Sequence, residues 1–309
     1  MSTGGAASVT ARTVHHRDYP VDELLAVKGT TTVAMCVPAR NEEATIGATV
    51  EALVALRRTG LVDEVVVVDD GSSDATADIS RAAGATVRPT GSVAGPGTGK
   101  GEALWTSLHA TSADVVAWCD ADISDFDERF VTGLVGPLLT DDDVDFVKAF
   151  YERSVDGHVG GGRVTELLAR PLITLLHPAL LAFHQPLGGE FAGRRDLLES
   201  LPFVTGYGVD LALLIDVVDA VGLERTVQVD LGTRTHRHRS LTSLRPTAVE
   251  VLHAGLRRAG VDVPPEVTCT DAELRLAERP PIRRDRSRLV RNGHSAGDPA
   301  SGGGGDTAR

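Results

Sequence analysis

Short runs of apolar and β-branched residues alternate with segments of helical periodicity over the first 120 residues of this 309-residue chain. The runs at 32–37, 64–68 and 114–119 have no polar face, which is typical of strands covered on both sides. The segment after the first run carries Ile46, Val50 and Leu53 at helical spacing. This alternation predicts an α/β fold with a mostly parallel, Rossmann-like sheet and helices on both faces.

The second half of the chain has weaker patterns. We expect strands at 145–150 and 226–231, helices at 209–221 and 241–259, and a strand interrupted by glycines at 185–191. The tail after 280 is rich in Arg, Gly, Ser and Asp, a composition typical of disorder.

Composition and charge exclude several classes of protein. The net charge of -12 argues against nucleic-acid binding and against adhesion to anionic lipid. The apolar stretch 171–183 contains His177 and Pro178 and is too short to span a bilayer, so it is expected in the core or at a homodimer interface. No secretory signal is visible and the three cysteines lack metal spacing, so we expect a cytoplasmic protein without stable membrane association.

The strand at 115–119 ends at two carboxylates, Asp120 and Asp122. Their spacing puts both side chains on the same face of the strand, where two anions repel each other and favour a cation. Carboxylate oxygens suit Mg²⁺ or Mn²⁺, the ions with which proteins hold a diphosphate. The alternative is a polar turn, because Asp is common in turns.

Two further motifs lie near expected strand ends. In 69–74 the paired carboxylates suit a nucleoside, although Ser72 and Asp74 can instead cap the following helix. The glycine-rich segment 97–102 presents Lys100, one of only three lysines, and is either a phosphate-binding loop or an ordinary surface loop; its spacing is not that of a Walker A motif. Ligands bind beyond the carboxyl ends of parallel strands, so Pro38, Asp70 and Asp120 are expected to line one crevice.

Together these motifs resemble those of a known enzyme family. The order Pro-Ala-x-Asn-Glu-Glu, Asp-Asp-Gly-Ser-Ser-Asp, Gly-Lys-Gly-Glu-Ala-Leu-Trp and Asp-Ala-Asp resembles glycosyltransferases of the GT-A fold. The segments 160–167, 185–190, 206–209 and 236–237 narrow the resemblance to the glucosyl-3-phosphoglycerate synthases of actinobacteria, over about 20–244.

The resemblance implies a retaining transferase that moves glucose from UDP-glucose or GDP-glucose to the 2-hydroxyl of 3-phosphoglycerate, with Mg²⁺ or Mn²⁺. It assigns Asp122 and His236 to the metal and Asp210 and Glu190 to catalysis. The expected nucleotide-sugar contacts are Pro38, Ala39, Arg40, Glu42, Asp70, Lys100, Asp120 and Gly189. The expected acceptor contacts are Gly162, Arg163, Val164, Thr165 and His238.

On this basis we predict an N-terminal arm at 1–30, a nucleotide-sugar-binding α/β half at 31–150, a smaller mixed α/β acceptor-binding half at 151–265 and a mostly disordered tail at 266–309. Asp210 and His238 stand where the family pattern has Glu and Asn, which leaves the acceptor open. From the residues alone, His236 could be a solvated loop residue and Asp210 a helix cap. A transferase with another small acceptor and a non-catalytic nucleotide-sugar-binding protein therefore remain alternatives.

Overall fold

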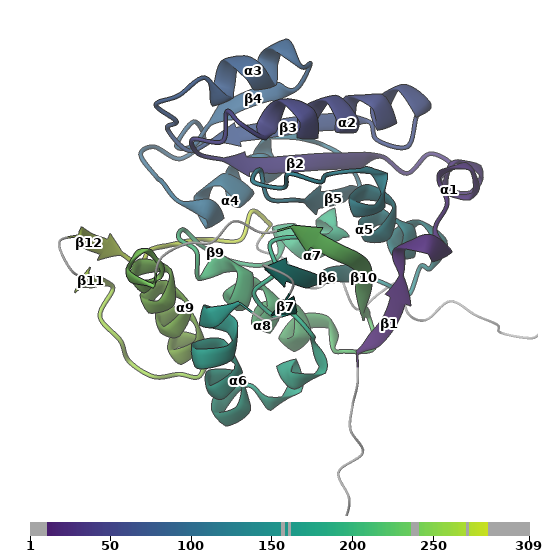
Figure 1. Cartoon of the computed structure of the whole chain (residues 1–309). Coiled ribbons are helices and arrows are strands. Elements are labelled where there is room, and N and C mark those ends of the chain that lie inside the picture. Colours follow the sequence, from purple (N-terminus) through teal and green to yellow (C-terminus); the bar gives the residue numbers. More distant parts are fainter. Residues whose placement is uncertain (1–10, 156–157, 160–161, 236–240, 270–271, 284–309) are drawn as a thin grey trace, which may run out of the picture.

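A nine-stranded sheet forms the centre of the molecule in the computed structural model, which describes residues 11–155, 158–159, 162–235, 241–269 and 272–283 (Figure 1). The strand order is β1-β10-β6-β8-β5-β2-β3-β4, with β7 paired to β6. Strand β8 is antiparallel to both of its neighbours, whereas the other strands along this order are parallel, so the expected mostly parallel sheet is confirmed. The strands are β1 Arg12–His15, β2 Val33–Ala39, β3 Glu64–Asp69, β4 Thr86–Pro89, β5 Val115–Trp118, β6 Phe146–Val155, β7 His158–Val159, β8 Phe191–Arg194 and β10 Thr226–Thr235.

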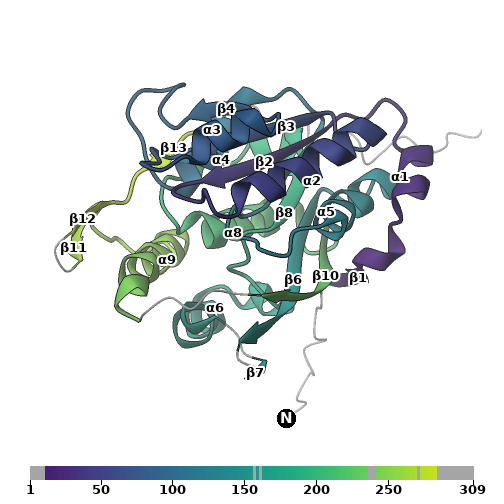
Figure 2. The same cartoon turned by 45° about the horizontal axis from the view of Figure 1, so that its top comes forward.

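Helices cover both faces of this sheet. Along β2, Val33 and Met35 pack into the core cluster that contains α2 and α5, and Ala34 and Cys36 pack into the cluster that contains α4 and α8. Figures 1 and 2 show α2 and α3 beside β2, β3 and β4, with α6 and α9 at the opposite end of the molecule. The helices are α1 Val21–Val27, α2 Ile46–Thr59, α3 Thr76–Ala82, α4 Lys100–Ala110, α5 Glu128–Thr140, α6 Arg170–Leu176, α7 Arg195–Glu199, α8 Val209–Val221 and α9 Arg245–Arg258.

Several expected elements differ in their ends. Strand β2 runs through Pro38 to Ala39. A proline is tolerated there because its backbone nitrogen faces the β5 side of the strand. Strand β5 ends at Trp118, so no hydrogen-bond partner for a backbone N–H lies at that position. The expected strand at 185–191 is wrong before Phe191, where a turn leads into β8. The expected helix at 241–259 is a 3₁₀ turn, η4 Thr242–Leu244, followed by α9.

The C-terminal part returns to the body of the molecule. Strands β11 Glu266–Cys269 and β12 Ala272–Arg275 form a hairpin, and β13 Glu278–Arg279 pairs antiparallel with β9 Phe203–Val204. Within the described residues, no helix is long and apolar enough to cross a membrane. The predicted division of the chain into four regions stays a prediction.

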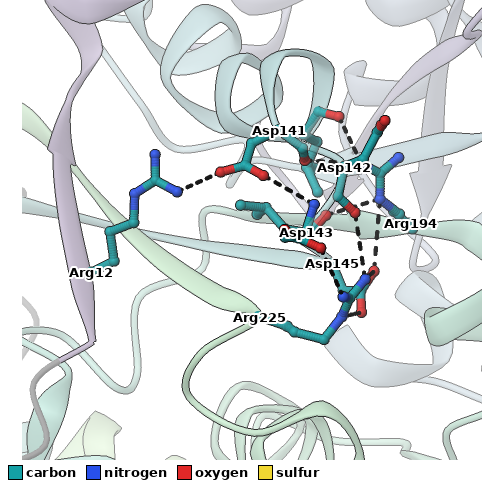
Figure 3. Close-up of polar contacts among 9 residues, drawn as sticks. Arg12, Asp141, Asp142, Asp143, Asp145, Arg194 and Arg225 are labelled. Atoms are coloured by element: carbon teal, nitrogen blue, oxygen red, sulfur yellow. Dashed lines mark hydrogen bonds and ion pairs between the residues drawn. The ribbon is translucent and has the colours of Figure 1, made fainter. Parts of the chain in front are cut away.

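Arginines and aspartates join several elements at one end of the sheet (Figure 3). Arg225 forms a two-pronged pair with Asp145, with Nε–Oδ2 and Nη2–Oδ1 distances of 2.5 and 3.0 Å. Around this pair lie Arg12 with Asp141 at 2.5 Å, Arg194 with Asp142 at 3.7 Å and Arg225 with Asp143 at 3.5 Å. We call these seven residues the loop cluster; it lies where β6 and β10 begin and β8 ends.

Candidate active site

The turns after β2 and β3 interlock through hydrogen bonds. Asn41, with a left-handed φ of 56°, accepts a hydrogen bond from the Ser73 backbone N–H through Oδ1 at 2.8 Å. The Glu42 backbone N–H donates to Thr76 Oγ1 at 2.8 Å. Asp74 accepts from the Thr76 backbone N–H at 3.0 Å, but the N-cap residue of α3 is Ala75, which has no side-chain cap, and Ser72 Oγ accepts from the Asn41 backbone N–H at 3.0 Å. These side chains therefore shape the turns at the strand ends.

Asp70 connects this region to the glycine-rich segment. The residue is buried, and both its carboxylate oxygens accept from the Gly99 backbone N–H at 3.0 Å. Thr90 donates to Asp70 at 3.1 Å, and Arg40 lies 3.4 Å away. Pro38, Ala39 and Arg40 lie at the end of β2, so the structure brings these expected nucleotide contacts beside Asp70.

Lys100 connects a carboxylate of the predicted nucleotide-sugar-binding half of the chain with a carboxylate of the predicted acceptor-binding half. At the start of α4, its Nζ lies 2.9 Å from Asp120 Oδ1 and 3.0 Å from Asp210 Oδ2. Burial alone would lower the pKa of Lys100, but the two carboxylates outweigh it and hold the pKa above its usual range. Lys100 is thus a charged ammonium between the end of β5 and the first turn of α8.

A second cation, Arg234 on β10, holds three acidic or polar side chains. Its guanidinium donates to Glu190 at 2.6 Å, to Asp122 at 2.7 Å and to the Tyr151 hydroxyl at 2.8 Å. Asp120 Oδ2 lies 4.0 Å away. We call Lys100, Asp120, Asp122, Glu190, Asp210 and Arg234 the crevice cluster; its acidic members include both expected catalytic residues.

Two carboxylates of the crevice cluster each keep one oxygen available. Within the described part of the chain, Glu190 Oε2 and Asp210 Oδ1 are buried and have no hydrogen-bond partner. Burial raises the pKa of Glu190 and of Asp210, although Arg234 and Lys100 respectively oppose the shift. Buried acceptors of this kind are suited to hydrogen bonds from a ligand hydroxyl.

The glycines before β8 pass close to these charges. A Cβ atom at Gly189 would clash with the Asp120 carboxylate, so the backbone approaches Asp120 as a side chain could not. The Gly188 carbonyl accepts from Lys148 Nζ at 2.5 Å, and this Nζ lies 4.6 Å from the centre of the Phe191 ring. Burial lowers the pKa of Lys148 to about 8.

Comparison with known proteins identifies the family. The model described as "Glycosyl transferase family 2" matches residues 35–207. A glucosyl-3-phosphoglycerate synthase of Mycolicibacterium smegmatis is 44% identical over 87% of this chain and 95% of its own length. The chain belongs to this family of glycosyltransferases. A synthase of Petrotoga mobilis is 41% identical over 81% of both chains.

Solved structures show the same fold. The Mycobacterium tuberculosis glucosyl-3-phosphoglycerate synthase in complex with Mn²⁺, UDP-glucose and phosphoglyceric acid has a TM-score of 0.82 at 40% identity, covering 92% of this chain and 100% of that one. The structure of that protein with Mn²⁺, UDP and glucosyl-3-phosphoglycerate has a TM-score of 0.79 at 41% identity. The expected GT-A fold and the expected glycosyltransferase class are therefore confirmed.

The expected acceptor segment lies at the start of a helical stretch. Gly162, Arg163, Val164 and Thr165 precede or begin η2 Thr165–Ala169, which leads into α6. The Gly162 carbonyl accepts from the Glu166 backbone N–H at 2.9 Å, Val164 packs against the core and Thr165 is buried. His236 and His238 lie outside the described residues.

The residues present suit a divalent cation in chemical type. Asp122 offers hard carboxylate oxygens and its side chain is 33% exposed. Within the described residues, however, no group of three or more His, Cys, Asp or Glu side chains is arranged to hold a metal. The other expected ligand, His236, follows Arg234 by two residues in the sequence.

Sequence reasoning missed two buried cations, Arg234 and Lys148. Lys148 interrupts a run of buried residues in β6, and a charged residue inside such a run was the available signal; Arg234 follows Gly232 and the exposed Thr233, so its part of β10 gave no such signal. The scarcity of lysine drew attention to Lys100 and applied equally to Lys148. What the sequence did not show was the partner of each cation, because Glu190 and Gly188 lie about 40 residues away along the chain.

Proposed function

We propose that this enzyme transfers glucose from UDP-glucose to the 2-hydroxyl of 3-phosphoglycerate and retains the configuration at the sugar. The observation that carries the proposal is the position of Lys100 between Asp120 and Asp210, where the expected nucleotide and acceptor regions meet. The names of relatives at 41–44% identity support the same donor and acceptor. The experimental complex of the M. tuberculosis relative with UDP-glucose and phosphoglyceric acid adds to this support.

The proposed donor site lies at the ends of β2, β3 and β5. Pro38, Ala39, Arg40, Glu42 and Asp70 surround the nucleoside, and Lys100 and Asp120 lie at the diphosphate. Asp122 and His236 hold Mg²⁺ or Mn²⁺, which when bound neutralises charge on the leaving diphosphate. Gly189 lets the backbone approach the sugar closely.

The proposed chemistry uses the two buried carboxylates unequally. Asp210 Oδ1 accepts a hydrogen bond from a sugar or acceptor hydroxyl, since this oxygen has no partner within the described residues. Glu190 is fully buried and paired with Arg234, so it orients that guanidinium. Attack occurs on the face that the diphosphate leaves, and a diphosphate oxygen accepts the proton of the acceptor hydroxyl. This route needs no covalent bond to the protein.

A matrix of donors and acceptors tests the function. UDP-glucose and GDP-glucose are each combined with 3-phosphoglycerate, glycerate or glycerol 3-phosphate, in Mn²⁺, Mg²⁺ or chelator, and nucleotide release is measured. We expect the highest kcat/KM for UDP-glucose with 3-phosphoglycerate, and loss of turnover in chelator. No transfer to 3-phosphoglycerate would overturn the proposal.

Arg163 tests the proposed acceptor site. Replacing Arg163 with Ala should raise KM for 3-phosphoglycerate about 10- to 100-fold, because a charge-assisted hydrogen bond contributes about 1.5–3 kcal/mol. KM for UDP-glucose should stay within twofold. Arg170→Ala is the control, because Arg170 lies on the same helical stretch and donates to the His184 carbonyl. Equal changes in both KM values for Arg163→Ala would refute the acceptor assignment.

A different small acceptor is the second candidate function. Asp210 is one methylene shorter than the Glu of the family pattern, and His238 replaces its Asn. Both substitutions concern the proposed acceptor side rather than the donor side. If another phosphorylated or carboxylated alcohol gives a higher kcat/KM than 3-phosphoglycerate in the matrix, this second function holds.

We also propose a homodimer. Leu167, Leu175 and Leu181 in η2, α6 and η3 Pro178–Ala182 are 76, 79 and 46% exposed, and α6 contacts both η2 and η3. Large exposed apolar side chains on adjoining elements mark interaction surfaces. Light scattering should give the dimer mass for the wild type and a monomer mass for Leu167→Asp/Leu175→Asp. Val27→Asp, at an exposed site on α1, should remain dimeric.

We place the enzyme in the cytoplasm. Cys36 and Cys119 are buried free thiols, which suits a reducing compartment. Fractionation of cells that express the chain should recover nucleotide release in the soluble fraction, and recovery with membranes would contradict this assignment.

A further inference from the structure

The segment 276–283, which we call the C-terminal strap, lies across the beginning of α4. Its β13 pairs with β9, with Arg279 opposite Phe203. The Ala277 carbonyl accepts from the Thr205 backbone N–H at 2.9 Å, and the Pro280 carbonyl accepts from Trp105 Nε1 at 3.2 Å. Figure 2 shows β13 beside α4. The strap therefore contacts the helix that begins with Lys100.

Arg279 extends from the strap to the buried carboxylate of Glu102. Its Nε and Nη2 donate to the two carboxylate oxygens at 2.6 and 2.9 Å, and Glu102 is fully buried. The guanidinium carbon lies 5.3 Å from the centre of the Trp105 ring. This fork is a fixed two-pronged contact, which a lysine could not reproduce.

The same guanidinium also contacts the glycine-rich loop. Arg279 Nη2 lies 3.5 Å from the Pro96 carbonyl oxygen. A Cβ atom at Gly97 would approach the Glu102 carboxylate and Arg279 too closely, so the loop lies directly against this pair. Arg279 thus joins the strap, the first turn of α4 and the loop before it.

Lys100 lies between the loop and Glu102. On one side the Gly99 backbone N–H donates to Asp70 at 3.0 Å. On the other side the Glu102 backbone N–H donates to the Thr205 carbonyl at 2.9 Å. Glu102, two residues after Lys100, is the partner that Arg279 holds, so the Arg279–Glu102 pair flanks the Lys100 backbone on this side.

We propose that Arg279 is a positioning residue for donor binding, which fixes the glycine-rich loop and the first turn of α4 so that Lys100 meets the donor diphosphate. The inference rests on the proposed use of UDP-glucose. Without the guanidinium, Glu102 is a buried carboxylate that has lost its two-pronged partner, and the loop packed against the pair loses its support. The resulting loss of affinity concerns the donor, because the strap contacts α4, and α4 begins with Lys100, which is proposed to lie at the donor diphosphate.

Arg279→Ala tests the proposal with Arg283→Ala as a matched control. Arg283 lies in the same strap and pairs with Glu199 and Asp196, away from the loop. UDP affinity is measured by calorimetry in Mn²⁺, and KM is measured for each substrate. We expect Arg279→Ala to weaken UDP binding and raise KM for UDP-glucose about tenfold or more, since small misplacements far from the chemistry are costly.

KM for 3-phosphoglycerate should stay within twofold in Arg279→Ala, and Arg283→Ala should keep wild-type UDP affinity. Arg279→Lys keeps the charge without the fork, so it should fall between Arg279→Ala and the wild type; it carries the same comparison if the alanine variant does not fold. Equal effects of Arg279→Ala and Arg283→Ala, or unchanged UDP affinity in both Arg279 variants, would overturn the inference. UDP affinity decides this point even if 3-phosphoglycerate proves not to be the acceptor.

Discussion

The molecule carries two clusters of carboxylates and basic side chains, one at each end of β6 and β10. In the loop cluster, Asp142 and Asp143 are almost fully exposed and pair with Arg194 and Arg225 at the surface. In the crevice cluster, Glu190 is fully buried and the Asp210 side chain is 9% exposed. Asp145 is the buried member of the loop cluster, whereas the crevice cluster holds two buried carboxylates beside the partly exposed Asp120 and Asp122.

This difference separates a structural role from a functional one. Exposed ion pairs contribute little to stability, because water already stabilises each charge. Buried charges are costly unless paired, and Glu190 and Asp210 each keep an oxygen without a partner within the described residues. The loop cluster connects neighbouring elements of the fold through ion pairs, whereas the crevice cluster holds charged side chains at the place where a ligand is expected to bind.

The largest effect is expected for Asp122→Ala. Turnover in Mn²⁺ should fall about a thousandfold, because an electrostatic contact to the developing charge is lost. Steady-state nucleotide release over a range of Mn²⁺ concentrations measures it. Asp142→Ala, at an exposed residue of the loop cluster, is the control, and its turnover number should equal that of the wild type. Wild-type activity in Asp122→Ala would rule out the metal assignment.

Arg234→Met should cause the largest loss of stability. Removal of this guanidinium leaves the fully buried Glu190 without its cation, so the free energy of unfolding should fall by about 3–5 kcal/mol. Arg225→Met in the loop cluster is the matched variant and should cost about 1 kcal/mol, because Arg225 itself is 34% exposed and its buried partner Asp145 keeps Arg194 at 3.7 Å. Urea unfolding of both variants gives the comparison, and equal losses would show that burial does not distinguish the clusters.

Because of Lys148, the free energy of unfolding should depend on pH in the alkaline range. Burial lowers its pKa from 10.5 to about 8, so the unfolded chain keeps the proton to higher pH than the folded chain. The contribution of Lys148 therefore becomes more favourable as pH rises between these values, by at most about 3 kcal/mol at 1.36 kcal/mol per unit. The difference in free energy of unfolding between wild type and Lys148→Met, measured from pH 8 to 10, should move in favour of the wild type. A constant difference would mean that Lys148 titrates normally.

The smallest effect is expected for Arg12→Ala. Arg12 pairs with Asp141 in the loop cluster and its side chain is 55% exposed, so the free energy of unfolding should change by no more than about 1 kcal/mol. The kcat for glucose transfer should be unchanged, as measured under the conditions used for Asp122→Ala. A loss of activity would show that the loop cluster communicates with the crevice.

Much of the site was predictable because its motifs follow strands. Pro38, Asp70 and Asp120 each lie at the end of a run of apolar residues, and neighbouring parallel strands bring these ends to one edge. The scarcity of lysine also marked Lys100. The role of Arg234 was not predicted, because it depends on ion pairs with Glu190 and Asp122, which no local sequence pattern reveals. Arg279 was missed for the same reason, since its partner Glu102 is 177 residues away.

The α/β class, the order of the donor motifs and the family follow from the amino-acid sequence, because hydrophobic periodicity and strand-end residues are local properties of the chain. Tertiary structure alone decided which carboxylate meets which cation. Pairing depends on register and burial: β8 runs antiparallel between β5 and β6 and places Glu190 beside Arg234, and the start of α8 places Asp210 beside Lys100. Desolvation then separates the crevice cluster from the loop cluster, although the two contain the same kinds of side chain.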